Sequence, residues 1–278
     1  MSTITPELLT SAEVAALFGV TATTVKRWAD AKLLKCEKTL GKHRRFARAE
    51  VERFKRAYEA SPQASKVAEE WVEDWLVFLR ETRSPSAIEA RLLQMHARLL
   101  RWDLVCDELG ELVCEIGLRW SRGELSILEE HLMSERLSRA LSRLAEWLPR
   151  SPDHPRALLA VPDSDEHTLG LALTELCFRE RAWETLWLGQ RTPLSSLPAE
   201  IARLTPGLGA VALSASVVSQ DAKRLAKDVT ELEGACAARG VLLVLGGRGA
   251  WPERPVYARR IDTFSELGVV LDSLKSAT

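Results

Sequence analysis

The stretch Ala157-Leu158-Leu159-Ala160-Val161, followed closely by Asp165-Glu166-His167-Thr168-Leu169-Gly170, decides the fold of this chain. The apolar run is short and unbroken, which is typical of a strand buried on both faces of a parallel sheet. A helix-like segment starts at Leu171, so the hexapeptide lies at the carboxyl end of the predicted strand. Ligands bind at that edge in open α/β sheets. The sequence therefore predicts a binding site around His167.

Short apolar runs alternate with helix-like segments through the rest of this region. Strands are predicted at Ala157–Val161, Thr185–Leu188, Ala210–Ser214 and Val241–Leu245, and helices near 170–181, 197–204, 221–239 and 264–274. Such alternation implies a parallel, doubly wound α/β sheet. We expect this Rossmann- or flavodoxin-like domain to occupy residues 156–278.

The residues around His167 suit a metal ligand. A neutral histidine can bind a metal through one ring nitrogen while Asp165 accepts the proton on the other, which fixes the tautomer. Gly170 follows at the start of the predicted helix. Taken alone, the hexapeptide is equally compatible with a loop histidine that caps this helix.

The spacing Asp165-x-His167-x-x-Gly170 resembles the signature of cobalamin-binding domains. In that family the histidine replaces the cofactor's own dimethylbenzimidazole as the lower ligand of cobalt. Two later elements, Ser214-Ala215-Ser216 and Gly246-Gly247, end predicted strands. The resemblance implies that Ser214, Ser216, Gly246 and Gly247 line the pocket for the displaced nucleotide tail, although Ser216 stands where leucine or threonine is more usual.

Four helices are predicted between the first 60 residues and the sheet. Apolar residues recur at three- and four-residue spacing in Val67–Thr82, Ser86–Leu100, Asp103–Arg119 and Ile127–Trp147. The stretch Ser61–Ser65 is expected to be a linker before these helices, and the proline-rich stretch Pro149–Pro155 separates them from the sheet. We therefore expect a four-helix bundle over residues 66–148.

Trp120 is followed after nine residues by Glu130-His131. This pattern resembles the signature of CarH/LitR-type photoreceptor repressors, which hold 5′-deoxyadenosylcobalamin. The resemblance implies that Trp120 covers the upper corrin face and that Glu130 and His131 contact the adenosyl group. Taken singly, Trp120 also fits a bundle core, and the Glu-His pair fits a solvated or capping position.

One position departs from the pattern of that family. Its members carry a histidine directly after the tryptophan, and this histidine takes the vacated upper cobalt position after illumination. Ser121 stands there in this chain, and a hydroxyl is a poor cobalt ligand beside imidazole. We therefore expect a photoproduct capped by water or by another histidine, His131 or His96.

The N-terminal residues predict a helix-turn-helix. Thr10 to Glu13 reads as a capping box that opens a helix through Phe18, and a turn at Gly19-Val20 leads to a second helix, capped by Thr21, over Ala22–Ala31. The second helix would lie in the DNA major groove. Val25 and Trp28 are expected to pack inward. The candidate base and phosphate contacts are Thr23, Thr24, Lys26 and Arg27.

A β-hairpin wing is predicted next. Leu34–Glu37 and Lys42–Phe46 flank a turn at Thr39-Leu40-Gly41. The side chains expected to reach phosphates or the minor groove are Lys42, His43, Arg44 and Arg45. Gly-Lys-His-Arg-Arg-Phe resembles the wing of MerR and excisionase-like DNA-binding domains, which implies a winged helix-turn-helix over residues 1–60. An exposed basic hairpin without a ligand is the alternative.

Charge separates this end of the chain from the rest. Residues 1–60 hold 12 Lys and Arg against 7 Asp and Glu, whereas the whole chain holds 38 and 39. A local basic excess favours contact with nucleic acid.

Composition narrows the cellular setting. The chain has 278 residues, no apolar run of 18 residues and no signal-like amino terminus, so we expect no membrane association. The cysteines show no metal-binding spacing, which indicates reduced thiols and a cytoplasmic location. They are Cys36, Cys106, Cys114, Cys177 and Cys236.

Together, these patterns predict a light-responsive transcriptional repressor that binds operator DNA and assembles with adenosylcobalamin into a homo-oligomer, a dimer to a tetramer. No catalytic triad, P-loop or carboxylate pair stands out, so we expect no enzymatic turnover. A corrinoid carrier that serves a methyltransferase or mutase is one alternative. A cobalamin-independent MerR-family regulator is another.

Overall fold

The computed structural model describes residues 8–18, 22–30, 34–39, 43–59, 62–82, 84–151, 155–219 and 221–275. The chain divides into two compact units, Met1–Phe78 (the N-terminal unit) and Leu79–Thr278 (the C-terminal unit). The C-terminal unit contains most of the predicted helical bundle together with the parallel sheet. The sequence assigns the bundle and the sheet to separate domains. The boundaries 1–60, 66–148 and 156–278 remain predictions.

The N-terminal unit contains the predicted helix-turn-helix and wing. Its elements up to the long connecting helix are β1 (Leu8–Leu9), α1 (Ser11–Phe18), α2 (Ala22–Asp30), β2 (Glu37–Lys38), β3 (Arg44–Ala47) and α3 (Arg48–Glu59). The strands form an antiparallel sheet in the order β1-β3-β2. The capping box is confirmed, since Thr10 Oγ1 accepts the N–H of Glu13 while the Glu13 carboxylate accepts that of Thr10. The turn at Gly19-Val20 and the cap Thr21 lie outside the described residues.

Aromatic packing holds these short elements together. Val25 and Trp28 point inward, as predicted, and the rings of Phe18, Trp28 and Phe54 contact one another at centroid distances of 5.0 to 5.7 Å. The first wing strand was predicted at Leu34–Glu37, which is wrong, because Leu34 is buried in this core and its N–H donates to the Trp28 carbonyl. Helix α3, which supplies Phe54, was not predicted.

Helices follow one another through the middle of the chain: α4 (Pro62–Glu81), α5 (Pro85–Leu99), α6 (Trp102–Ser121) and α7 (Ile127–Trp147). Helix α4 begins at Pro62, so the prediction of a linker over Ser61–Ser65 is wrong for its described part. Proline is tolerated in the first turn of a helix because its missing N–H would have no partner there. At α7, Ser126 and Glu129 form a reciprocal capping box.

The sheet of the C-terminal unit is parallel and doubly wound. Its strands are β4 (Arg156–Pro162), β5 (Glu184–Thr192), β6 (Leu208–Ala215), β7 (Leu242–Gly247) and β8 (Arg259–Arg260), in the order β5-β4-β6-β7-β8. The strand order reverses between β4 and β6, and ligands of such sheets bind at this switch point. Strand β8 was not predicted, and β5 extends beyond the expected Thr185–Leu188.

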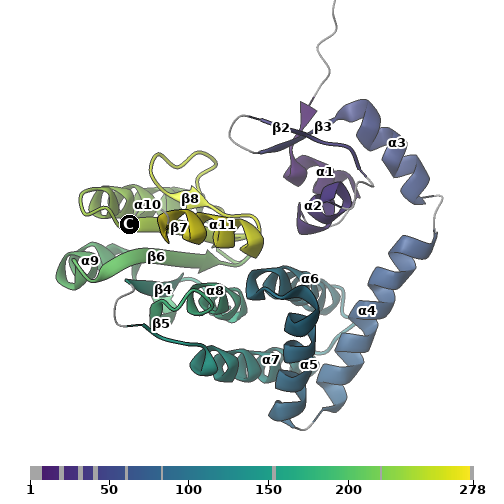
Figure 1. Cartoon of the computed structure of the whole chain (residues 1–278), viewed down its shortest axis with the longest axis horizontal. Coiled ribbons are helices and arrows are strands. Elements are labelled where there is room, and N and C mark those ends of the chain that lie inside the picture. The colour runs from purple at the N-terminus through teal and green to yellow at the C-terminus, as the bar shows by residue number, and fades with distance from the viewer. Residues whose placement is uncertain are drawn as a thin grey trace, which may run out of the picture. The chain divides into compact units, whose positions relative to one another are not determined.

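Helices cover both faces of this sheet (Figure 1). Helices α8 (Leu169–Arg179) and α11 (Phe264–Lys275) lie on one side, where α6 and α7 pack on α8 and α6 also packs on α11. Helices α9 (Leu197–Leu204) and α10 (Ala222–Ala237) bury the opposite face in a core of Leu, Val and Ile. The bundle therefore packs on one layer of the α/β sandwich.

Strand β5 forms one edge of the sheet and is irregular. Gly189 has φ of 78° and Arg191 has φ of 55°, and its pairing with β4 shifts register near Leu159 and Ala160. Trp187 and Leu188, in the middle of the strand, are both exposed.

Within the described ranges, the structure holds no helix that is both long enough and apolar enough to cross a bilayer.

Candidate functional site

His167 lies at the strand-order switch point, in the loop between β4 and α8. Its Nδ1 is 2.8 Å from Asp165 Oδ1, and the same oxygen accepts the backbone N–H of His167 at 3.0 Å. Asp165 is fully buried, whereas 61% of the His167 side chain is exposed. When His167 is neutral and Nδ1–H donates to Asp165, Nε2 carries the free lone pair. The geometry expected for an oriented metal ligand is present.

The second oxygen of Asp165 binds the end of β6. Oδ2 accepts the backbone N–H of Ser216 at 2.5 Å and the hydroxyl of Ser219 at 2.9 Å. Burial opposes ionisation of Asp165, but hydrogen bonds from His167 and Ser216 outweigh it and hold the pKa of this carboxyl well below its ordinary value. In return, the hydrogen bond to Asp165 raises the pKa of His167 against the effect of burial.

Ser219 was not predicted as part of the site. It is 2% exposed, and its only sequence signal is a hydroxyl shortly after an apolar strand. Ser216, which was predicted, also places its Oγ 3.2 Å from His167 Nδ1. The two strands at the switch point are therefore joined through one carboxylate.

Gly170 and Ser214 meet behind the histidine. A Cβ built on Gly170 would lie 2.8 Å from Ser214 Oγ, so a larger residue at the first turn of α8 would displace this hydroxyl. Ser214 is buried at 7% exposure. Both predicted residues thus contact each other in the wall of the site.

The glycine pair at the end of β7 differs in its two members. Gly247 has φ of +83°, and a Cβ there would collide with the Ala215 backbone. A Cβ on Gly246 would meet only the Leu213 carbonyl oxygen, at an ordinary 3.8 Å. Packing of the chain explains Gly247, whereas Gly246 leaves room for a close approach to the backbone.

The predicted bundle residues lie at the junction of α6 and α7. Trp120, in the last turn of α6, is 50% exposed. Glu130 Oε2 is 2.5 Å from His131 Nδ1, and Glu130 Oε1 accepts the hydroxyl of Ser134 at 2.6 Å. The Glu130 carboxylate lies near enough to His167 to contribute to its raised pKa, after the larger effect of Asp165. Of the predicted bundle residues, Glu130 is therefore the one whose charge acts on the sheet edge.

The two histidines proposed to replace the missing one at position 121 have different surroundings. His96 stacks on Trp102 with ring centroids 4.5 Å apart, at the N-terminal end of α6. Trp120 is at the other end of this 20-residue helix, about 30 Å away. The prediction is therefore wrong for His96 and stays open for His131. Ser121 donates its hydroxyl to the Leu118 carbonyl.

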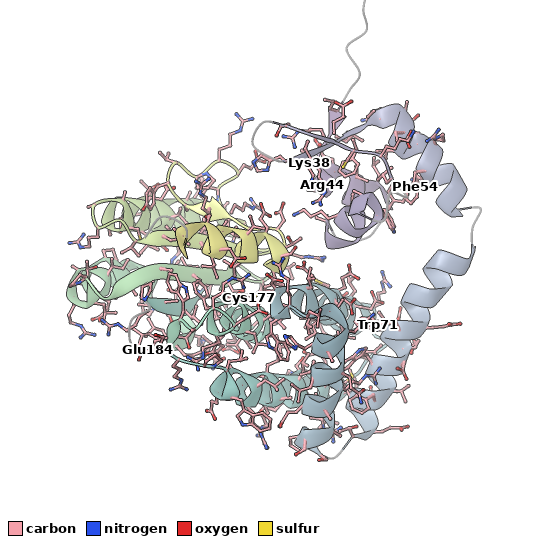
Figure 2. All side chains as sticks on the ribbon, viewed as in Figure 1. Lys38, Arg44, Phe54, Trp71, Cys177 and Glu184 are labelled. Carbon is pink, nitrogen blue, oxygen red and sulfur yellow. The ribbon has the colours of Figure 1, made fainter. Side chains whose placement is uncertain are left out.

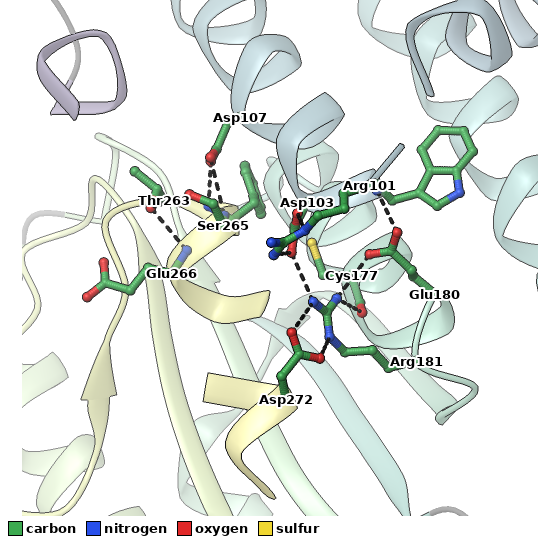
Figure 3. A network of polar contacts seen from close by, with 12 residues as sticks. Arg101, Asp103, Asp107, Cys177, Glu180, Arg181, Thr263, Ser265, Glu266 and Asp272 are labelled. Atoms are coloured by element: carbon green, nitrogen blue, oxygen red, sulfur yellow. Dashed lines mark hydrogen bonds and ion pairs between the residues drawn. The ribbon is translucent and has the colours of Figure 1, made fainter. Parts of the chain in front are cut away.

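A buried ionic network fixes the N-terminal end of α6 (Figure 3). Arg181 donates to Asp103 Oδ2 at 3.0 Å and to both oxygens of Asp272 at 2.7 and 3.0 Å, which joins α6 to α11 just beyond α8. Burial lowers the pKa of Arg181, but its bonds to Asp272 and Asp103 outweigh burial and raise it overall. Arg101 binds Asp103 through two further nitrogens.

Asp107 adds a second link from α6 to α11. Its carboxylate accepts the backbone N–H groups of Phe264 and Ser265, the first residues of α11, at 2.6 and 3.3 Å (Figure 3). A carboxylate at a helix N-terminus satisfies free N–H groups and favours the helix dipole. Sequence reasoning missed this network and the residues in it.

The candidate nucleic-acid interface lies in the N-terminal unit. Lys38 and Arg44 come from the paired strands β2 and β3, and Phe54 comes from α3 (Figure 2). His43 is exposed, and Arg44 and Arg45 are half-buried. Thr23, Thr24, Lys26 and Arg27 all lie on α2, as predicted, but only the side chain of Lys26 is described, and it is half-buried. Lys42 lies outside the described residues.

Comparison with known proteins finds matches for both units of the chain. The helix-turn-helix domain family matches residues 8–58. The HTH-type transcriptional repressor CarH of Myxococcus xanthus is 30% identical over 200 residues, which cover 72% of this chain and 65% of CarH. The chain is therefore similar in sequence to this repressor. The HTH-type transcriptional repressor CarA of the same organism is 29% identical over 161 residues, 58% of this chain and 52% of CarA.

The matched region spans less than two thirds of each of these CarH-type relatives. Among solved structures, the monomethylamine corrinoid protein of Methanosarcina barkeri superposes with a TM-score of 0.54. The match covers 73% of this chain and 96% of the corrinoid protein, at 16% sequence identity. The shared fold is the helical layer followed by the parallel sheet, as predicted.

Proposed function

We propose that this CarH-type chain is a light-responsive transcriptional repressor that uses 5′-deoxyadenosylcobalamin as its chromophore. The observation that carries the proposal is the exposed His167 imidazole, fixed through Nδ1 by the buried carboxylate of Asp165. A single oriented imidazole suits a metal whose other positions are filled by a macrocycle and its upper group.

The residues around His167 fit a corrin and its nucleotide tail. Gly246 leaves space that a Cβ would fill at the end of β7, and Ser216 presents a hydroxyl beside His167. Trp120 is a large, half-exposed aromatic at the junction of α6 and α7. An indole of this size offers an apolar surface, and a corrin with its adenosyl group would bury it.

Adenosylcobalamin supplies, when bound, a Co–C bond that visible light breaks. His167 would hold the cobalt through Nε2, and Asp165 would keep the proton on Nδ1. Trp120 would exclude water from the upper face, and Glu130 with His131 would bind the adenosyl group by hydrogen bonds. These roles use side chains from the loop after β4 and from the junction of α6 and α7.

Regulation would follow from linkage between cofactor and assembly. A cofactor that binds the oligomer more tightly than the monomer stabilises the oligomer, and the loss of the adenosyl group removes part of that difference. Several helix-turn-helix units in one oligomer bind neighbouring half-sites of operator DNA with avidity, which dissociation removes. No turnover of a substrate is required.

Size-exclusion chromatography of the full chain with adenosylcobalamin tests the proposal, with absorbance recorded in the dark and after green illumination. We expect a dark oligomer that carries corrin absorbance and becomes smaller in light. His167→Ala should lose the corrin, and His96→Ala, with its histidine stacked on Trp102, should behave as wild type.

The remaining outcomes separate the alternatives. Absence of corrin from the wild-type peak would leave a cobalamin-independent regulator. A corrin-loaded peak whose size and spectrum ignore light would favour a carrier or a sensor of cobalamin itself. The helix-turn-helix match over residues 8–58 argues against the carrier.

A further inference from the structure

Strand β8 carries a group of arginines along one edge of the sheet in the C-terminal unit. It pairs with β7 and ends the strand order on that side (Figure 1). Arg259 and Arg260 form the strand itself, and Arg254 lies in the loop that leads to it. All three residues are exposed. We call this group the basic edge.

The charges of the basic edge are not neutralised within the described residues, where no carboxylate forms an ion pair with these three arginines. Other exposed arginines of the same unit do have such a partner, as Arg139 has in Glu135 and Arg203 in Glu200. Acidic residues also outnumber basic ones over residues 61–278 as a whole. The basic edge is therefore a local positive surface on an acidic unit, and it attracts anions.

The loop before β8 is fixed at both ends. Glu233 of α10 is buried and accepts the backbone N–H groups of Tyr257 and Ala258 at 2.6 and 2.8 Å. At the other end, the buried indole of Trp251 donates to a carbonyl at the end of β7 at 2.8 Å, and Arg260 donates to the Trp251 carbonyl at 3.4 Å. A ligand of this surface would order little further backbone, which keeps the entropic cost of binding low.

Duplex DNA is the polyanion that fits this surface, because the same chain matches the helix-turn-helix domain family over residues 8–58. A planar guanidinium matches the geometry of a phosphate and donates two parallel hydrogen bonds to it. A contact that is weak by itself gains strength when a tethered unit already holds the duplex, since its effective concentration is then high.

We propose that the basic edge is a second DNA-contacting surface, which binds backbone phosphates of the duplex held by a helix-turn-helix unit. The contact goes beyond the proposed function, because it needs neither cobalamin nor light. It adds affinity without reading bases, since phosphates carry no sequence information of their own. Its strength falls as salt rises, because binding releases the counterions of the DNA.

Fluorescence anisotropy of the full chain with a labelled duplex of mixed sequence tests this proposal over a range of salt concentrations. A duplex of about 40 base pairs, roughly four helical turns, leaves room for both surfaces. The double variant Arg259→Gln and Arg260→Gln, the β8 variant, should bind about tenfold more weakly than wild type at about 0.1 M salt. The slope of log affinity against log salt should become shallower by about 1–2. The loss should be the same with and without adenosylcobalamin in the dark.

Two further variants separate local contact from net charge. Arg139→Gln with Arg203→Gln changes the net charge equally at two other exposed positions and should stay within about twofold of wild type. Replacement of Arg259 and Arg260 by Lys keeps both charges and should recover most of the affinity. Thermal unfolding checks that each variant is folded.

A wing variant, Arg44→Gln with Arg45→Gln, distinguishes this inference from the DNA binding of the helix-turn-helix. If the β8 variant matches wild type in affinity and slope while the wing variant loses binding, the basic edge is refuted and the helix-turn-helix stands. The arginines would then serve only to keep the edge strand from pairing with other chains. Equal losses in the β8 variant and the charge control would also refute the contact. If wild type binds no duplex even at low salt, the proposed repressor fails together with the basic edge.

Discussion

The two ends of helix α6 show opposite ways of joining a helical bundle to a sheet. At the N-terminal end, Asp103 and Asp107 are buried and bonded to Arg181 and to the first turn of α11. At the C-terminal end, Trp120 and Ser121 are exposed, and so is His131 in the first turns of α7, the next helix. Protein groups complete the first junction, whereas the second leaves an indole and an imidazole exposed. The buried network and the proposed cofactor site therefore belong to separate ends of one helix.

Disruption of the ionic network at the N-terminal end of α6 should have the largest effect on stability. Arg181→Ala leaves the buried Asp103 without one of its partners, so we expect the free energy of unfolding to fall by about 3–5 kcal/mol. Arg139→Ala is the control, because Arg139 is 70% exposed in its pair with Glu135 and should change stability by less than about 0.5 kcal/mol. Chemical denaturation measures both. Equal losses of unfolding free energy in the two variants would contradict a stabilising role of the network.

The two glycines at the end of β7 sharpen the contrast between structure and binding. Gly247→Ala forces a Cβ against the Ala215 backbone at a positive φ, so we expect a loss of about 1–3 kcal/mol in unfolding free energy. Gly246→Ala meets no close atom and should unfold as wild type, yet bind corrin more weakly. Denaturation and corrin titration of both variants check this. Normal corrin affinity in Gly246→Ala would argue against backbone approach there.

Ser126 caps α7, which follows the exposed C-terminal end of α6. Removal of this cap should reduce stability only modestly. Ser126→Ala removes the acceptor for the Glu129 N–H and should cost about 1 kcal/mol of stability. Ser121→Ala, at an exposed hydroxyl that bonds within its own helix, should cost less than about 0.5 kcal/mol. Thermal unfolding compares the two. A larger loss of stability in Ser121→Ala than in Ser126→Ala would contradict the capping role of Ser126.

The smallest effect concerns pH. The raised pKa of His167 means that its bond to Asp165 adds stability fully below the ordinary value of 6.5, and that this is lost as pH rises through the folded value. The lowered pKa of Asp165 keeps its contribution above the ordinary value of 3.8. His167→Ala should therefore destabilise the cofactor-free chain more at about pH 5.5 than at about pH 9. Because His167 is exposed, the difference should stay below about 1 kcal/mol, measured by urea unfolding at both pH values. A difference that is larger at high pH would contradict the pairing.

The sequence predicted the candidate site residues better than the ionic network at the N-terminal end of α6. Asp165 and His167 follow an unbroken apolar strand, so a local pattern places them at the sheet edge, and Ser216 and Gly247 follow their strands in the same way. The position of the Glu130–His131 pair next to that edge needs the tertiary fold, because α6 and α7 must pack on α8 first.

The ionic network at the N-terminal end of α6 was not predicted because its residues are distant from one another in sequence. Asp103 is bound by Arg181, which also binds Asp272, and nothing in the local pattern connects these residues. A signal was present, since Asp103 and Asp107 stand four residues apart among the buried Trp102, Val105 and Cys106. Two acids on the apolar face of a helix indicate buried partners, because an unpaired buried charge is costly. Strand β8, with two residues, is too short for any periodicity.

The irregular edge strand β5 has a consequence for the behaviour of the protein at high concentration. A straight outer strand with an exposed tryptophan and leucine would invite other chains to extend the sheet. The left-handed residues Gly189 and Arg191 interrupt the row of backbone donors and acceptors just past Trp187 and Leu188. The irregular backbone at this edge therefore disfavours growth of the sheet into open-ended aggregates.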